Sequence, residues 1–488
     1  MALEAIKIFL GVSFILNLIF IFIVIFFERK SPSSTWAWIF VLSVLPYFGF
    51  IFYLIFGLDS RRHKIFVLKA KLDHNLYYEY LNLVYDKNYF FEDKNLKQEK
   101  NILRIPGYEN LNDLVYMNYK IGASAVTLNN KINFFCDGKE KFENLMKDIE
   151  RAEKFIHMEY FIFKDDKLGK KIMDLLVKKA KAGLEIRILL DGMGCIKNSR
   201  DFYKDLINAG GEVIFFLPPK IFRANFRNHR KICVIDGKIG YLGGFNIGDE
   251  YLGESKKFGF WRDSHIKIFG DAVKQLELRF IMDRNFCVNN KLNLEEKYFP
   301  EIETVDCTSM QIISSGPDNF WEVIKFNYFK MINEANKYIY IQTPYFVPDD
   351  SILEALKTAA LSGIDVKIII PAKPDHIFVY WTSLYYIGEL LKAGAKCYKY
   401  KKGFLHSKLI LVDKKLFSIG TANMDIRSFR LNFETNAIIY DKNLTSEFEK
   451  IFINDLNGCE EILKEDYENR SCFIKIKESI SRLLAPIL

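Results

Sequence analysis

Two copies of one short pattern, His229-Arg-Lys231-Ile-Cys-Val-Ile-Asp236 and His406-Ser-Lys408-Leu-Ile-Leu-Val-Asp413, decide how this sequence folds. Both copies read H-x-K-x4-D, and both are rich in the aliphatic residues that favour buried strands. On a strand, residues two apart point to the same face, so the His and the Lys of each copy project together. The sequence has only seven histidines. One such short motif would be weak evidence, but the duplicated pattern is strong.

The two motifs belong to a longer internal repeat. Residues 155–163 (FIHMEYFIF) correspond to 338–346 (YIYIQTPYF), and glycine-led strand patterns correspond in the same way. Each element recurs about 180 residues later in the same order, which indicates a duplicated domain rather than a solenoid. Strand-like and helix-like segments alternate from about residue 125 onward. We therefore predict an α/β protein of two similar halves, 121–300 and 301–488, related by a pseudo-twofold axis with one site between them.

A turn of small residues follows each motif acid and ends in asparagine. The turns contain Gly244-Phe-Asn246 in the first half and Thr421-Ala-Asn423 in the second. Small residues let backbone N–H groups approach an anion closely, and each asparagine adds a side-chain donor. The two turns are therefore candidate phosphate-binding elements.

The residue types of the two motifs suit transfer at a phosphodiester. A neutral imidazole can attack phosphorus and form a phosphohistidine, and a second, protonated imidazole can protonate the leaving alkoxide. Two lysines and two asparagines can hold the non-bridging oxygens and offset the growing charge. Because these donors suffice, and because the sequence has no clustered Asp, Glu and His at metal-ligand spacing, we predict neither a metal nor another cofactor.

The N-terminal segment, 1–64, has the pattern of a membrane hairpin. Residues 8–27 are almost unbroken apolar sequence, long enough to span a bilayer as a helix, and a second apolar run covers 35–57. The second run follows at once and no small-x-small site precedes the charged turn, which favours two retained spans over a cleaved signal peptide. More Lys and Arg follow the second run than occupy the turn, so we expect a cytoplasmic catalytic part. Residues 65–120 are predicted to be a juxtamembrane connector with some helix.

The amino-acid composition limits the classes of protein to which the chain can belong. With 488 residues, half of them hydrophobic, the chain can form two or three compact units and is not a disordered protein. The net charge of +8 favours an anionic partner, which leaves a lipid surface and nucleic acid open. The eight cysteines show no CxxC spacing, as expected of reduced core residues.

The paired motifs and their asparagine turns resemble the phospholipase D superfamily. Three further stretches narrow the resemblance to bacterial cardiolipin synthases, namely 45–57 (LPYFGFIFYLIFG), 246–253 (NIGDEYLG) and 425–434 (DIRSFRLNFE). The resemblance covers nearly the whole chain and is weakest in 65–120. It implies two phospholipase D-like α-β-α halves behind a two-helix transmembrane hairpin, in a multi-pass protein of the cell membrane.

The resemblance also implies a ping-pong transfer. One histidine takes a phosphatidyl group from phosphatidylglycerol and releases glycerol, and a second phosphatidylglycerol then attacks to give cardiolipin. We assign His229 as the nucleophile and His406 as general acid and then base, and the pseudo-symmetry leaves the reverse assignment open. The implied partners are these lipids and the bilayer, without nucleic acid, and a homo-oligomer is left open.

A catalytic imidazole usually needs a carboxylate on its other nitrogen. The motif acids Asp236 and Asp413 lie too far along their strands to reach their own histidines, so they are candidates for stabilising turns. Asp263 and Glu434 follow the two histidines by about thirty residues, on the next predicted strand of each half, and related superfamily members use acids near these positions. We predict that Asp263 and Glu434 orient the imidazoles.

Three rival functions remain compatible with the sequence. A hydrolytic phospholipase D would use the same residues with water as the acceptor. A nuclease is permitted by the net charge, although no concentrated Lys/Arg stripe accompanies the motifs. A non-enzymatic membrane scaffold would be expected to lose part of one motif, whereas all six motif residues are present.

Overall fold

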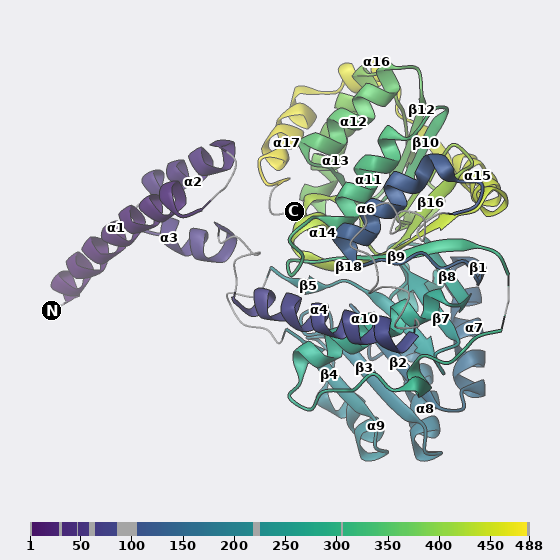
Figure 1. Ribbon diagram of the computed structural model, residues 1–488. Coiled ribbons are helices and arrows are strands. Elements are labelled where there is room, and N and C mark those ends of the chain that lie inside the picture. Colours follow the sequence, from purple (N-terminus) through teal and green to yellow (C-terminus); the bar gives the residue numbers. More distant parts are fainter. Residues whose placement is uncertain are drawn as a thin grey trace, which may run out of the picture.

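The computed structural model describes residues 2–28, 32–45, 47–57, 64–84, 105–217, 225–303 and 306–485. Two α/β halves stack on one another, and helices of the N-terminal segment stand to one side of them (Figure 1). The predicted fold class of two similar halves is confirmed.

The N-terminal segment agrees only in part with the predicted pair of spans. The first apolar run forms one long helix, α1 (Ala2–Phe26). The second run is divided into α2 (Pro32–Val44), α3 (Gly49–Phe52) and a π-helical turn, η1 (Tyr53–Gly57). Within the described residues, one helix is long and apolar enough to cross a membrane, over Lys7–Phe26.

Proline explains why the second run is not one continuous helix. Helix α2 ends at Val44, two residues before Pro46 in the sequence. Proline lacks a backbone N–H, and it disfavours a helical conformation in the residue before it. Of the basic residues behind the predicted orientation, Arg29, Lys30, Arg61 and Arg62 lie outside the described residues.

The first half contains a mixed sheet with the order β1-β8-β7-β6-β2-β3-β4. Strands β2, β3 and β4 run parallel, and β6, β7 and β8 form an antiparallel meander beside them. The strands are β1 (Asn130–Asp137), β2 (Phe155–Tyr160), β3 (Glu185–Asp191), β4 (Glu212–Phe216), β6 (Lys231–Ile235), β7 (Ile239–Gly243) and β8 (Phe260–Gly270). The helices are α7 (Gly138–Arg151), α8 (Lys167–Lys181), α9 (Lys204–Asn208) and α10 (Ala272–Cys287), with short turns η4 (Arg200–Tyr203), η6 (Asp249–Leu252) and η7 (Glu296–Tyr298).

The second half repeats this arrangement with the order β19-β13-β12-β10-β15-β16-β18, and β9 pairs with β18 as β1 pairs with β8. Its strands are β9 (Ser309–Ser315), β10 (Tyr338–Gln342), β12 (Asp365–Pro371), β13 (Lys396–Tyr400), β15 (Leu409–Val412), β16 (Leu416–Gly420), β18 (Asn432–Tyr440) and β19 (Cys459–Glu461), with a separate pair, β11 (Phe346–Val347) and β17 (Met424–Asp425). Its helices are α11 (Val323–Asn333), α12 (Asp350–Leu361), α13 (Ile377–Lys392), α14 (Ile426–Arg430), α15 (Lys442–Leu456), α16 (Lys464–Glu468) and α17 (Cys472–Arg482).

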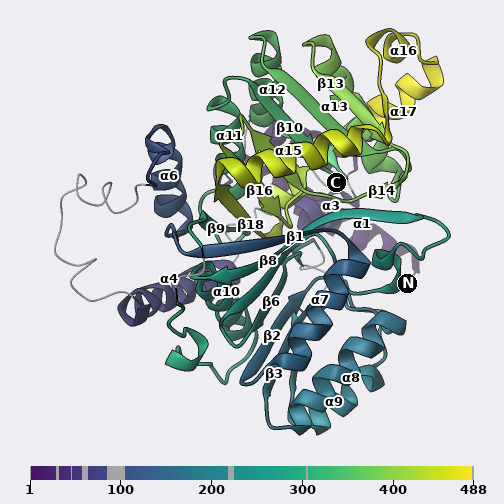
Figure 2. The same cartoon turned by 90° about the vertical axis from the view of Figure 1, so that its right-hand side faces the viewer.

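Aspartate caps explain where corresponding helices of the two halves begin. Asp166 accepts a hydrogen bond from the N–H of Gly169 at the start of α8, and Asp349 accepts one from Ile352 at the start of α12. Such a cap satisfies a backbone donor that the first helical turn leaves free. Helices α7, α8 and α9 lie over the outer face of the first sheet, and α15 lies across the second sheet (Figure 2).

The inner faces of both sheets share one hydrophobic core with α10 and α15. Much of the expected connector is also packed into the body. Helix α4 (Lys64–Val84) buries Phe66, Tyr80 and Leu81 in this shared core. Helix α6 (Asn112–Gly122), preceded by η3 (Glu109–Leu111), packs into the core of the second half.

Candidate active site

Each motif histidine is held by a short strand that joins the sheet of the other half. Strand β5 (Arg227–Asn228) pairs with β18, and β14 (Gly403–Leu405) pairs with β8. The exchange continues into the histidines themselves. The backbone N–H of His229 donates to the carbonyl of Phe433 at 2.9 Å, and the N–H of His406 donates to the carbonyl of Arg262 at 2.7 Å. The two motif segments, which lie about 180 residues apart in the sequence, therefore meet at one site.

Each imidazole also contacts a carboxylate of the other half. Nδ1 of His229 lies 3.0 Å from both carboxylate oxygens of Glu434. Nδ1 of His406 lies 2.6 Å from Oδ2 of Asp263. A carboxylate on Nδ1 favours the tautomer that protonates this nitrogen and leaves Nε2 as the reactive atom.

The predicted orienting acids are thus within hydrogen-bond reach of imidazoles, but the pairing is crossed. Sequence proximity associated Asp263 with His229 and Glu434 with His406, and the structure brings each acid to the other histidine. The exchange of β5 and β14 is the physical reason, because it moves each histidine to the end of the opposite sheet.

Burial controls the charges in the site. It lowers the pKa of His229 to about 4, although the carboxylate of Glu434 opposes this effect. Burial also lowers the pKa of Lys231 to about 7 and that of Lys408 to about 8. The pKa of His406 is lowered as well, by burial and then by Lys408. His229 is therefore neutral at neutral pH, and an arriving phosphate would favour the charged forms of His406 and of both lysines.

The motif aspartates lie at the far ends of their strands, away from the imidazoles. The carboxylate of Asp236 accepts backbone N–H groups of residues 153–155, and that of Asp413 accepts those of residues 336–338. Both aspartates have positive φ, at 56° and 55°. Each one fixes a turn to the start of the neighbouring strand, β2 or β10. Of the six motif residues, four thus lie in the site and two are structural acids.

The two asparagine turns differ in what they leave free. Oδ1 of Asn246 accepts from the N–H of Ile162 at 3.0 Å, and its amide donates to the hydroxyl of Tyr251 at 3.3 Å. Oδ1 of Asn423 is buried without a hydrogen-bond partner among the described residues. A carbonyl oxygen can only accept a hydrogen bond, so this atom of Asn423 suits a donor group and not a phosphate oxygen.

The small residues of the turns make room for the carboxylates. A Cβ on Gly244 would lie 1.9 Å from Oδ1 of Asp263, so a side chain there would displace the carboxylate that contacts His406. At the corresponding place in the second half, the hydroxyl of Thr421 accepts from the N–H of Thr435, the neighbour of Glu434, at 2.9 Å. We infer that these residues support the orienting acids rather than bind phosphate directly.

Comparison with known proteins decides the family. Residues 145–282 and 328–456 match the family described as "Cardiolipin synthase, PLD-like domain", and residues 15–57 match "Phospholipase_D-nuclease N-terminal". A cardiolipin synthase of Listeria innocua is 46% identical over 482 residues, which cover 97% of this chain and 98% of that protein. The chain belongs to the cardiolipin synthase family. A cardiolipin synthase of Staphylococcus aureus is also 46% identical, over 487 residues that cover 99% of this chain and 97% of that protein.

A solved structure supports the same fold. Phosphatidylserine synthase of Haemophilus influenzae aligns with a TM-score of 0.60 at 16% identity, covering 77% of this chain and all of that one. The fold of the two halves is therefore that of phospholipase D-type enzymes. This cardiolipin synthase family member is a membrane protein and a phosphatidyltransferase that makes cardiolipin.

No pattern in the sequence indicates the buried charge network that lies beside His229. Asp283 of α10 pairs with Arg230, the residue after His229. Glu159 of β2 accepts a hydrogen bond from the amide of Asn228, the residue before His229, at 2.5 Å. Burial and then Asp283 raise the pKa of Glu159 to about 8. Both neighbours of the first motif histidine are thus fixed by buried acidic groups.

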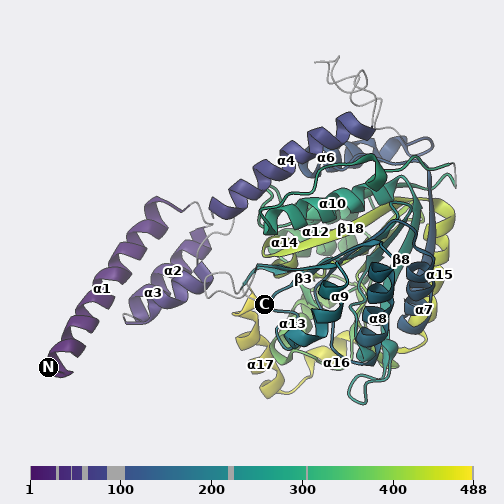
Figure 3. The ribbon, with the colours of Figure 1, turned by 90° about the horizontal axis from the view of Figure 1, so that it is seen from below.

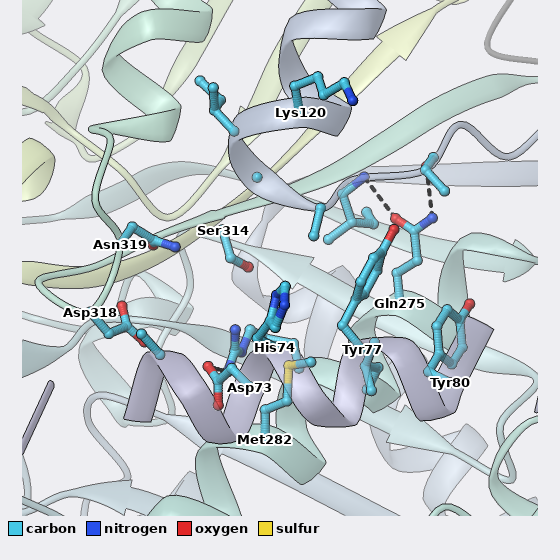
Figure 4. A pocket seen from close by; sticks show the side chains of 18 of the residues that line it. Asp73, His74, Tyr77, Tyr80, Lys120, Gln275, Met282, Ser314, Asp318 and Asn319 are labelled. Carbon is cyan, nitrogen blue, oxygen red and sulfur yellow. Dashed lines mark hydrogen bonds and ion pairs between the residues drawn. The ribbon is translucent and has the colours of Figure 1, made fainter. Parts of the chain in front are cut away.

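The network reaches the juxtamembrane helix α4. Lys69, fully buried, contacts Asp73 at 2.7 Å and both Asp283 and Asp318 at 2.8 Å. A cavity of about 300 Å³ lies along the same helix, and Figure 4 shows Asp73 and Asp318 facing it with His74. Because this side of α4 borders a cavity, packing alone does not fix the helix there. The ion pairs of Lys69 therefore connect α4 to the residues around His229.

Replacing Lys69 tests whether this connection matters. Lys69→Met removes the cation that pairs with Asp318 and one of the cations that pair with Asp73 and Asp283. We expect it to lower the melting temperature and to reduce kcat about tenfold or more through displacement of His229. Thermal unfolding and cardiolipin formation measure the two effects. Lys71→Met, an exposed position on the same helix, is the matched control and should change neither. Adding Asp318→Asn to Lys69→Met should recover part of the stability. An unchanged melting temperature and unchanged turnover in Lys69→Met and in the double variant would contradict the proposed role of Lys69.

Proposed function

We propose that this enzyme joins two phosphatidylglycerol molecules into cardiolipin and glycerol through a phosphatidyl-histidine intermediate. The observation that supports this mechanism best is the pair of crossed dyads, His229 with Glu434 and His406 with Asp263, in one site with two lysines. Two histidines with separate acids suit a reaction of two successive transfers, because one can remain bound to phosphorus while the other moves protons.

In the first transfer, Nε2 of His229 attacks phosphorus of the donor lipid. The bond from phosphorus to the glycerol headgroup breaks, and His406, in its protonated form beside the carboxylate of Asp263, gives its Nε2 proton to the departing oxygen. Lys231 and Lys408 offset the charge on the non-bridging oxygens. The low pKa of His229 supports its assignment as nucleophile, since its Nε2 carries no proton at neutral pH.

In the second transfer, the terminal hydroxyl of another phosphatidylglycerol attacks the same phosphorus. His406 now removes the hydroxyl proton, the bond from phosphorus to Nε2 of His229 breaks, and cardiolipin leaves. Over the two transfers together, one phosphodiester bond is exchanged for another of similar energy, so the overall reaction is reversible and excess glycerol should drive it backward.

For the membrane arrangement, we propose that α1 spans the cell membrane and that the catalytic halves are cytoplasmic. The apolar helix over Lys7–Phe26 supports the span. The shorter apolar helix over Ser34–Val44 supports a partial insertion, in which this segment enters the membrane from the cytoplasmic side and returns to that side.

The reaction is tested by mass spectrometry of the purified enzyme with phosphatidylglycerol vesicles, beside a His229→Ala control. Cardiolipin with an equal amount of free glycerol, absent in the control, is the expected result. Phosphatidic acid in place of cardiolipin would show that water is the acceptor and would refute the transfer. Supplying excess glycerol with cardiolipin should regenerate phosphatidylglycerol.

A further inference from the structure

The C-terminal helix α17 shows an apolar face to the outside. Phe473, Ile476, Ile480 and Leu483 are 67%, 49%, 56% and 71% exposed. Their spacing of three and four residues places them along one side of the helix. Side chains of this size rarely form a continuous exposed stripe on a soluble surface, so this stripe marks an interaction site.

The opposite side of α17 faces the protein, and its most deeply buried residues are polar. Glu478 and Ser481 are the buried residues of the helix. The carboxylate of Glu478 pairs with Arg470 at 2.6 Å and accepts a hydrogen bond from the hydroxyl of Tyr467 at 3.1 Å. A surface helix normally buries its apolar side and exposes its polar side. Helix α17 instead buries Glu478 and Ser481 and exposes its large apolar side chains, an arrangement that an apolar environment on its outer side would stabilise.

Cations flank the apolar stripe and also attach α17 to α13. The Lys477 ammonium lies over the rings of Trp381 and Phe473, at 5.1 and 4.5 Å from their centroids. Arg482 donates to the hydroxyl of Tyr385 at 2.8 Å. An apolar stripe with basic residues at its sides is the pattern of a helix that lies in the interface of an anionic membrane.

The position of α17 agrees with this environment. In Figures 1 and 3, α17 lies on the side of the catalytic body that faces the helices α1 and α3. The first residues of α13, the helix beneath it, add Ile377 and Phe378, which are 63% and 54% exposed. Exposed apolar groups therefore occur on both of these packed helices, α13 and α17.

We propose that α17 lies in the headgroup region of the bilayer in which α1 is embedded, with Phe473, Ile476, Ile480 and Leu483 among the acyl chains. The catalytic body then touches the membrane at a second place, far from α4 in the sequence. Two attachments fix the orientation of the catalytic body relative to the bilayer, whereas a single attachment leaves the body free to rotate. Lipids that leave the bilayer would then meet the site in a constant direction. This proposal concerns membrane contact and does not depend on which lipid is transferred.

Site-directed spin labelling tests the contact directly. The full-length protein, with the exposed Cys307 and Cys472 replaced by serine, is labelled at Ile476→Cys or at Lys475→Cys and placed in nanodiscs of phosphatidylglycerol. We expect the label at 476 to collide with oxygen, which concentrates in lipid, more than with a water-soluble nickel complex, and the label at 475 to show the opposite preference. Equal access of the nickel complex to both positions would overturn the proposal.

Activity on two forms of substrate provides an independent test. We expect Ile476→Glu with Ile480→Glu to reduce turnover on phosphatidylglycerol vesicles about tenfold, and to leave turnover on dispersed dihexanoyl phosphatidylglycerol within about twofold. Leu361→Glu, which places a single negative charge at a 73% exposed leucine at the end of α12, should leave both unchanged. Equal loss on both substrates would show that the stripe supports the fold, and an altered oligomer in light scattering would show that a second copy covers it; either result overturns membrane contact. Failure of the unmodified enzyme on both substrates would instead refute the proposed function, while the spin-label result would stand.

Discussion

His229→Ala should reduce cardiolipin formation by at least about 10⁴-fold, and His406→Ala by a similar factor, because one variant lacks the nucleophile and the other lacks the proton carrier. Equal losses with the natural lipid would not tell the two roles apart. A phosphatidyl ester of p-nitrophenol does so, because its leaving group departs as a stable anion and needs no proton.

With this activated ester, His406→Ala should still release p-nitrophenolate in a single burst. Its phosphatidyl group should then remain on His229, because no general base activates the second hydroxyl. Mass spectrometry of the peptide that contains residue 229 should find an adduct that is lost in acid, as expected of a bond between phosphorus and nitrogen. The His229→Ala variant serves as the control and should give neither burst nor adduct.

An adduct on His406 in the reciprocal experiment would reverse the assignment while preserving the two-step mechanism. The structure gives a reason to expect His229. Its neighbours Asn228 and Arg230 are fixed by Glu159 and Asp283, and burial lowers its pKa to about 4. An attacking imidazole benefits from both a fixed ring and a free Nε2.

The sequence predicted the main features of the fold because they depend on local pattern. The duplicated motif and the repeated strand patterns identified two halves with one shared site. Chemistry likewise predicted that an acid must contact each imidazole, which is how Asp263 and Glu434 were found. The exchange of β5 and β14 between sheets was not predictable, because those strands are two and three residues long and have no pattern of their own.

Two other features depend on tertiary contacts that the sequence does not display. Lys69 lies in a segment that reads as a charged connector, yet its ammonium is fully buried among three carboxylates. The second apolar run has the length and composition of a span, but the helix ends two residues before Pro46. In the first case the partners are distant in sequence. In the second case, the hydropathy of the whole run indicates a span, whereas a single residue, Pro46, explains why the helix ends early.

The crossed dyads predict different effects for substitution of their two acids. Glu434→Gln should slow formation of the phosphohistidine by about 10²–10⁴-fold with phosphatidylglycerol and with the activated ester alike, because the amide no longer fixes the tautomer of the attacking His229. Asp263→Asn should slow the reaction of phosphatidylglycerol by a similar factor. With the activated ester, however, its burst should stay within about tenfold of the unmodified enzyme, since the proton of His406 is then unnecessary.

Pairing within each half would give the opposite result, with Asp263→Asn losing the burst and Glu434→Gln retaining it. Stopped-flow measurement of p-nitrophenolate therefore distinguishes the two arrangements in one experiment. The double variant Glu434→Gln/His229→Ala should be no slower than His229→Ala alone, because residues that act as one unit do not lose activity additively. Crossing has a functional consequence: each half supplies a histidine and the acid for the other one. Neither half then has a complete dyad, so correct docking of the two halves is itself a condition for catalysis.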